Sequence, residues 1–235
     1  MVIDFHTHIL PQIDDGSGSL EESIALLKME AEQGIRFAIA TPHFYAHRDT
    51  PEKFLERRNA AERRLRDEMR NYEGLPDITV GAEVYFFPGM SASEALPQLT
   101  IRNTRCIMIE MPPPPWTEQM YDELKAVYDR QGLIPIIAHV DRYIRPFRTY
   151  NIPKRLEQLP VYVQANASFF IRKETSRMAL KMLREGNIHL LGSDCHNMDS
   201  RTPNLEEALQ VILNKLGKRA IRRIKLVERE VLFGE

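Results

Sequence analysis

The sequence predicts an α/β fold in which a barrel of parallel strands is covered by helices. Short runs of β-branched residues alternate with longer segments in which apolar residues recur every three to four positions, and this alternation continues along the chain. Seven strand-like runs, one fewer than in the usual eight-stranded barrel, favour a (β/α)7 arrangement, although an open doubly wound sheet shows the same alternation. No linker, repeat or low-complexity segment interrupts the pattern, so we expect one domain over residues 1–235.

The predicted elements differ in the spacing of their apolar residues. The strands occupy residues 2–6, 36–40, 78–81, 106–109, 134–138, 161–164 and 188–192. The helices occupy residues 19–34, 50–72, 117–132 and 173–186. The hydroxyl groups of Ser19 and Thr50 can cap the first two helices. Gly34, Gly132 and Gly186 follow three of the helical patterns and mark their ends.

The composition is that of a globular protein in a reducing compartment. The 235 residues are 43% hydrophobic and 28% charged, which allows a well-buried core. The 32 basic and 33 acidic residues give a net charge of −1, without the overall basic excess that favours nucleic acid or an anionic membrane as a partner. The two cysteines form no disulfide framework, and neither a signal-peptide pattern nor a long apolar run is present. We therefore expect a cytoplasmic protein that is not inserted in a membrane.

Polar side chains recur at the points where the predicted strands end. In a barrel, the carboxyl ends of the strands meet at one rim, which is where barrel enzymes carry their chemistry. A single histidine at such a position would usually be structural, but six of the seven strands end in His, Asp or Glu. The candidate ligands, with one acid taken from the Asp14–Asp15 pair, are His6, His8, Asp15, His43, Glu83, Glu110, His139, Asp194 and His196.

The number of these ligands indicates more than one metal ion. Five imidazoles and four carboxylates are too many for a single ion and suit two or three divalent ions bridged by a carboxylate. Three such ions bring about +6 against −4 from the carboxylates, so the site favours an anion such as a phosphate monoester. Arg142 and Arg201 lie close in sequence to these ligands and can bind phosphoryl oxygens. We expect a metal-bridging hydroxide to act as the nucleophile.

The segment GSDCHNMDSRT offers a different chemistry, because Cys195 and Arg201 have the C-x5-R spacing of phosphatases that use a thiolate. Such a loop wraps backbone N–H groups round the phosphate and usually needs glycine. The intervening residues HNMDS contain no glycine and bring the negative charge of Asp199 into the loop. We therefore expect Cys195 to be a packing residue between two metal ligands.

The motifs DFHTHILPQIDDG, TPHF, GAEVYF, IEMP, AHVDRY and GSDCHNMDSR, in this order, resemble those of the polymerase-and-histidinol-phosphatase (PHP) superfamily. They are most similar to its bacterial manganese-dependent protein-tyrosine phosphatases of capsule and exopolysaccharide loci. The resemblance implies a distorted, TIM-like barrel of seven strands with three metal ions, usually Mn²⁺, with Fe or Zn as alternatives.

The resemblance also implies a role for each motif residue. The first ion would be held by His6, His8, Glu83 and Asp194. Glu83 would bridge to a second ion, which Glu110 and His139 also bind. The third would be held by Asp15, His43 and His196, where Asp15 is chosen because the acid next to glycine matches the family ligand. Arg142 and Arg201 match the phosphate-binding arginines, whereas Asp141 stands where relatives often have glutamate.

The activity expected from this resemblance is hydrolysis of phosphotyrosine in a protein, with a bacterial tyrosine kinase as the partner. Tyr85, Trp116 and Tyr143 are either candidates to stack on the substrate ring or packing residues. The alternatives are a phosphatase of a small metabolite such as histidinol phosphate, a PHP phosphodiesterase, and a metal-binding regulator that docks on a kinase. The oligomeric state is left open.

Overall fold

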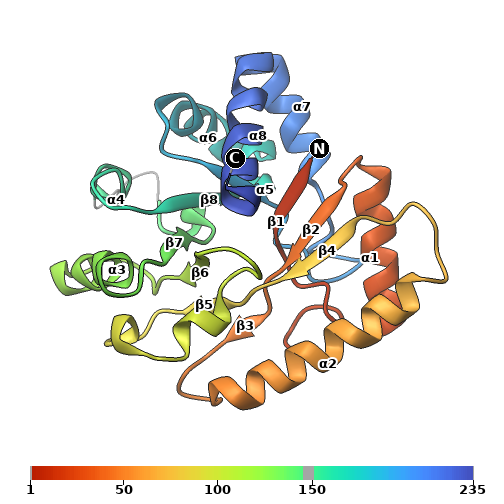
Figure 1. Cartoon of the computed structure of the whole chain (residues 1–235). Helices are drawn as coiled ribbons and strands as arrows, with labels where there is room; N and C mark the ends of the chain where they lie inside the picture. Colours follow the sequence, from red (N-terminus) through yellow and green to blue (C-terminus); the bar gives the residue numbers. More distant parts are fainter. Residues whose placement is uncertain (1, 145–150, 235) are drawn as a thin grey trace.

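The protein is described here by a computed structural model that covers residues 2–144 and 151–234. Its strands, all paired in parallel, lie round a common centre with most helices on the outside (Figure 1). The strands are β1 (Ile3–Thr7), β2 (Phe37–Ala40), β3 (His43–Phe44), β4 (Asp77–Val80), β5 (Glu83–Tyr85), β6 (Cys106–Glu110), β7 (Ile134–Ile137), β8 (Tyr162–Asn166) and β9 (Leu190–Gly192). They form a sheet with the order β1-β2-β4 and a second with the order β3-β5-β6-β7-β8-β9.

Helices occupy the connections between most of the strands. The α-helices are α1 (Leu20–Glu32), α2 (Pro51–Met69), α3 (Glu118–Gln131), α4 (Ile152–Leu156), α5 (Ala167–Ile171), α6 (Lys173–Glu185), α7 (Leu205–Leu216) and α8 (Lys218–Phe233). Short 3-10 helices are η1 (Met90–Ala92), η2 (Leu96–Leu99) and η3 (Val140–Arg142). The described residues contain no helix with the length and apolar character needed to cross a bilayer.

The predicted elements are present, and their ends follow local chemistry. Each of the seven predicted strands has a counterpart, with ends that agree within about two residues. The Ser19 and Thr50 side chains accept hydrogen bonds from backbone amides in the first turns of α1 and α2. Gly132 and Gly186 end α3 and α6 in the left-handed conformation, with φ of 65° and 91°.

The pairing of β2 with β4 continues beyond the predicted ends of both strands, into the pairing of β3 with β5. Pro42 has no N–H to donate, and it separates β2 from the short strand β3. The backbone ladder nevertheless continues, because the Gly81 amide donates to the Ala40 carbonyl and the Glu83 amide to the Pro42 carbonyl, both at 2.9 Å. The pairing of β3 with β5 then sets His43 directly opposite Glu83.

The first and last strands also meet. The Asp194 amide donates to the His6 carbonyl at 2.8 Å, and the His8 amide donates to the Cys195 carbonyl at 2.9 Å. The chain therefore has an α/β fold whose parallel strands curve round and form at least part of a barrel. The last two helices, α7 and α8, follow β9 without another strand, and the strand–helix alternation does not predict them.

An apolar cluster fills the space that the strands surround. Most of its buried side chains come from five strands, which is typical of a packed barrel interior, and α8 adds Val231. The strand residues include Phe5, Ile39, Met108, Ile136 and Leu190. A larger apolar cluster packs the helices on the outside of the strands. The packed interior gives the strand ends a rigid base.

Candidate metal centre

The carboxyl ends of the strands bring all nine predicted ligand residues to one rim. They stand on or directly after β1, β3, β5, β6, β7 and β9, with Asp15 on the loop that follows β1. Ligand atoms from eight of them, all except His139, form three overlapping groups, each within 4.8 Å. The groups are His6–His8–Asp194, His43–Glu83–Glu110 and His8–Asp15–His43–His196.

The first group is built on the alternation of side chains along β1, which points His6 and His8 to the same side. Their Nε2 atoms are 3.1 Å apart. Glu83 Oε2 lies 3.3 Å from each of these nitrogens. Asp194 Oδ1 lies 3.7 Å from His6 Nε2 and 3.6 Å from His8 Nε2. Four donor atoms thus surround one small volume.

The second group shares Glu83 Oε2, which lies 3.0 Å from His43 Nδ1, and the other oxygen of Glu83 faces His139. Glu83 Oε1 is 2.6 Å from His139 Nε2. Glu110 approaches from β6, with Oε1 3.7 Å from His139 Nε2 and Oε2 3.9 Å from His43 Nδ1. Because Oε2 faces the His6–His8 pair and Oε1 faces His139, Glu83 has the geometry of a bridging carboxylate.

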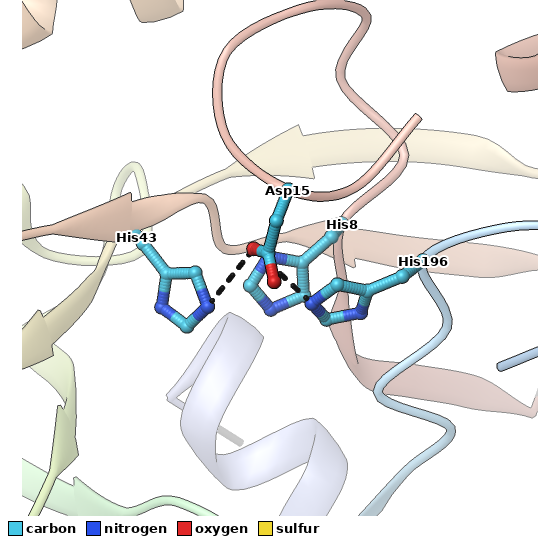
Figure 2. Close-up of side chains that lie close together, drawn as sticks. All are labelled: His8, Asp15, His43 and His196. Carbon is cyan, nitrogen blue, oxygen red and sulfur yellow. Dashed lines mark ion pairs between the residues drawn. The ribbon is translucent and has the colours of Figure 1, made fainter. Parts of the chain in front are cut away.

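The third group is shown in Figure 2, where the Asp15 carboxylate lies between the rings of His43 and His196. Asp15 Oδ1 is 3.3 Å from His43 Nε2 and 3.6 Å from His196 Nε2. The rings of His8 and His196 are 3.8 Å apart between centroids. His8 and His43 therefore each belong to two of the three groups, whereas the motif-based assignment gave each of them to a single ion.

Buried atoms without partners test whether these residues suit metal ions. Glu83 Oε2, His43 Nδ1 and His196 Nε2 have no hydrogen-bond partner among the described residues. Buried polar atoms are normally hydrogen-bonded, so three unsatisfied atoms in one cluster indicate that a ligand completes the site. Burial and the neighbouring His8 lower the pKa of His196 to about 4, which keeps the imidazole neutral near neutral pH. Its Nδ1 lies 2.9 Å from the Asp194 carbonyl oxygen, which can only accept a hydrogen bond, so Nε2 is left without a proton. The donor set of imidazoles and carboxylates fits divalent transition metals.

Both predicted arginines reach the same carboxylate. Arg142 Nη2 donates to Asp194 Oδ2 at 2.5 Å, and Arg201 Nη2 lies 2.7 Å from Asp194 Oδ1. Arg142 Nη1 is also 3.4 Å from Glu110 Oε1. The two guanidinium groups are partly exposed, so they border the ligand cluster on the side that an anion would approach.

Hydrogen bonds orient the ligands, and two of the residues that make them were not predicted. Asp14 Oδ2 is 2.7 Å from His8 Nδ1 and accepts the His43 amide at 2.9 Å. Burial raises the pKa of Asp14, but its pairing with His8 outweighs this and lowers it to about 2. Gln164 Oε1 accepts the His139 amide at 2.5 Å and lies 3.3 Å from His6 Nδ1. Such outer contacts fix ring orientation and tune the ligand.

The backbone is strained and crowded at the site. His139 and Asp194 adopt left-handed conformations with φ of 31° and 57°, which non-glycine residues rarely do outside functional sites. A Cβ at Gly192 would lie 2.5 Å from His6 Cβ, and one at Gly16 would lie 2.3 Å from the His8 carbonyl oxygen. Glycine is therefore required where two segments approach the histidine pair.

Cys195 lies in an environment unsuited to a nucleophile. The residue is fully buried, and its Sγ is 4.0 Å from Glu30 Oε1. Burial raises the pKa of the Cys195 thiol, and the nearby carboxyl groups of Glu30 and Asp4 raise it further. These observations favour the predicted packing role.

Two acids outside the three groups, the buried Asp4 and the half-buried Asp141, fix the backbone near the candidate ligands. Asp4 accepts the amides of His6 and Ser193, each at 3.0 Å. Asp141 accepts the Asn166 amide at 2.9 Å, which ties η3 to the end of β8. Asp4 therefore has a structural position.

The aromatic candidates divide into buried and accessible side chains. Trp116 and Tyr143 are only 7% and 3% exposed and pack on each other, so they belong to the core. Tyr85 is partly exposed, and its ring lies 5.7 Å from that of Tyr45, which in turn lies 5.3 Å from His43. Tyr45 was not predicted, because a tyrosine two residues after a histidine has no distinctive pattern. It lines a hollow of about 440 Å³ that also contains Asp15, His43 and Arg48.

The fold and the site together define a class of protein. It comprises α/β proteins that gather imidazoles and carboxylates at the carboxyl ends of parallel strands, in an arrangement suited to several divalent ions. Comparison with known families is more specific: this chain belongs to the capsular polysaccharide synthesis family CpsB/CapC, which matches residues 2–233. The resemblance inferred from the motifs is confirmed.

Individual relatives match over most of the chain. Tyrosine-protein phosphatase YwqE from Bacillus subtilis is 31% identical over 226 residues, which cover 92% of this chain and 85% of the relative. Tyrosine-protein phosphatase CpsB from Streptococcus agalactiae is 29% identical over 227 residues, which cover 92% of both chains. A solved structure from work on YwqE of Bacillus subtilis and CpsB of Streptococcus pneumoniae, called unique metal-dependent tyrosine phosphatases, matches with a TM-score of 0.81. The identity there is 25%, and the match covers 98% of this chain and 94% of the other.

Proposed function

We propose that this chain is a metal-dependent protein-tyrosine phosphatase. The observation that carries the proposal is the contact of two arginines with Asp194, which also borders the imidazoles of His6 and His8. A phosphate group between the arginines and this cluster would meet cations on both sides. The names and metal dependence of the relatives support the same activity.

The proposal assigns three divalent ions, with Mn²⁺ as the first choice and Fe or Zn as alternatives. His6, His8, Glu83 and Asp194 would hold the first ion, Glu83, Glu110 and His139 the second, and Asp15, His43 and His196 the third. Ions bound there would lower the pKa of a water molecule and offset the charge of the phosphate. The unsatisfied Glu83 Oε2, His43 Nδ1 and His196 Nε2 support this assignment.

The protein groups around the ions bind and orient the substrate. Arg142 and Arg201 would turn from Asp194 to the phosphoryl oxygens and stabilise charge as the P–O bond to the phenol breaks. The phenol of tyrosine, with a pKa of about 10, leaves without a strong general acid. Tyr45 and Tyr85 border the cluster and would hold the substrate ring by stacking.

The biological context is part of the proposal. The substrate would be a phosphorylated tyrosine kinase of a bacterium, acting in capsule or exopolysaccharide synthesis, since the family is that of capsular polysaccharide synthesis. A cytoplasmic location agrees with the free thiols of Cys106 and Cys195. We also propose one domain and a distorted seven-stranded barrel, in which β2 continues into β3 and β4 into β5.

The proposal is tested with phosphotyrosine peptides assayed with and without Mn²⁺. We expect turnover that a chelator abolishes and added Mn²⁺ restores, with little activity on the matched phosphoserine peptide. Hydrolysis of histidinol phosphate without peptide turnover would replace the proposed substrate. Turnover that resists chelation and is lost in Cys195→Ser would overturn the metal-dependent mechanism.

A further inference from the structure

The surface formed by the end of α6 and by α7 and α8 is strongly basic. Two adjacent hollows of about 740 and 320 Å³ open there, and no acidic residue lines either one. Arg222 borders both hollows. We call this surface the basic face and define it by Arg184, Lys215, Lys218, Arg219, Arg222, Arg223 and Lys225. The helices that carry it lie side by side at the top of Figure 1.

The cations of the basic face form no close ion pair in the described part of the chain, although Lys225 interacts electrostatically with the buried Glu228. Among the described residues, none of its seven side chains has a carboxylate oxygen within 4.0 Å. The chain as a whole carries a net charge of −1, so this local excess does not show in the composition. Unbalanced positive charge concentrated on one surface attracts anionic partners.

Helix stability does not explain the bases of α8. Cations are favourable near the carboxyl end of a helix, which accounts for Arg184 in the last turn of α6 and Lys215 in the last turn of α7. However, Lys218, Arg219 and Arg222 lie in the first two turns of α8, where the helix dipole disfavours positive charge and the first turn contains no acid. These bases oppose helix formation, so a role in binding is a better explanation than one in folding.

Apolar side chains are exposed among the bases. Leu226 is 66% exposed, and it lines the larger hollow together with Leu216 and Ala220. Leu226 follows Arg219 and Arg222 at helical spacing, so all three lie on the same side of α8. Phe233, two turns further along α8, is 51% exposed. Basic and apolar groups that share a helix face are typical of helices that lie on the surface of a membrane.

We propose that the basic face docks this protein on a membrane surface that contains anionic phospholipids. The bases would bind lipid phosphates, while Leu226 and Phe233 would enter the boundary between head groups and acyl chains. The exposed apolar side chains favour an anionic amphiphile over a soluble acidic protein. The helix α6, which carries Arg184 in its last turn, ends just before β9 begins, so the basic face lies toward the amino end of β9. Asp194, by contrast, follows the carboxyl end of β9. The metal centre would stay accessible in the docked protein.

The test measures co-sedimentation of the full chain with lipid vesicles. We expect binding to vesicles of phosphatidylcholine and phosphatidylglycerol, no binding to phosphatidylcholine alone, and loss of binding at high salt. The variant Lys218→Glu/Arg219→Glu/Arg222→Glu should bind about 100-fold more weakly, because each base near an anionic surface contributes additively. Its acids suit the amino end of α8, so the variant should fold.

A matched variant controls for net charge. Lys53→Glu/Arg63→Glu/Arg70→Glu makes the same change at exposed positions of α2 and around its end, and it should bind vesicles like the unaltered protein. Leu226→Asn should weaken binding about tenfold without removing its dependence on salt. Equal loss in the two triple variants would overturn the proposal. So would binding to an acidic peptide without binding to anionic vesicles.

Discussion

The two ends of the strands carry charge in opposite ways. At the carboxyl ends, the acids Glu83 and Asp194 and the imidazole of His8 are almost completely buried, and His8 Nε2 lies within 3.6 Å of an oxygen of each acid. On the basic face, seven cationic groups lie at the surface without a carboxylate partner among the described residues. Burying charged groups costs free energy of folding unless a ligand pairs with them. The exposed cations of the basic face cost little, because water solvates and screens them.

This difference predicts two kinds of response to substitution. A buried cluster depends on the placement of each atom, so single changes should remove its chemistry. An exposed basic surface acts through summed charge, so it should respond gradually and should be sensitive to salt. The following substitutions test this contrast, from the largest expected effect to the smallest.

Glu83→Gln should have the largest effect. Its Oε2 faces His8 and its Oε1 faces His139, and the change to an amide removes the negative charge from both oxygens. We expect kcat/KM on a phosphotyrosine peptide to fall by about a thousandfold or more, with less bound metal by mass spectrometry. Glu118→Gln, which changes an exposed acid paired with Arg155, is the matched control. Activity and metal content near those of the control would contradict the bridging role of Glu83.

Asp14→Asn should have a smaller effect, because Asp14 acts through His8 and the His43 amide rather than as a ligand in any of the three groups. Loss of such an outer carboxylate typically costs about 10- to 100-fold in metal affinity or activity. The measurement is a Mn²⁺ titration of activity, in which the midpoint should move to higher concentration. Recovery of full activity at high Mn²⁺ would support a positioning role. An unchanged midpoint would contradict it.

Tyr45→Ala should affect one class of substrate more than another. If Tyr45 stacks on the substrate ring, kcat/KM should fall up to about tenfold on an aryl phosphate and little on an alkyl phosphate. Tyr128→Ala, at an exposed position on α3, should change neither value. Equal losses on both substrates would show that Tyr45 shapes the metal centre and does not select the ring.

The charge-reversed α8 variant, Lys218→Glu/Arg219→Glu/Arg222→Glu, should have the smallest effect on chemistry. Its substitutions lie on the face that borders the two basic hollows, and none contacts a ligand residue in the described part of the chain. We expect kcat/KM on a soluble phosphotyrosine peptide to stay within about twofold of the unaltered protein. A tenfold loss would show that the two ends of the strands are energetically coupled.

The sequence indicates which side chains gather at the rim, because strand ends are local features. An apolar run that ends in His6 or Glu110 identifies both the strand and the side chain at its end. A parallel arrangement then brings these ends together without any knowledge of distances. The same reasoning selects Arg142 and Arg201, since each follows a strand-end ligand within a few residues.

The remaining features depend on three-dimensional proximity. Gln164 lies inside a predicted strand, and only the fold shows that it contacts both His6 and the His139 amide. Asp14 and Asp15 are adjacent and chemically equivalent in sequence, yet one orients His8 and the other lies between His43 and His196. The basic face combines residues from α6 to α8, so neither composition nor a single motif reveals it.

The most direct test of the metal centre is anomalous diffraction from crystals grown with Mn²⁺. The account predicts three strong peaks at the rim, one within each group of ligand atoms, with Glu83 beside two of them. Diffraction data that place no manganese between the His6–His8 pair and Glu83 would contradict it.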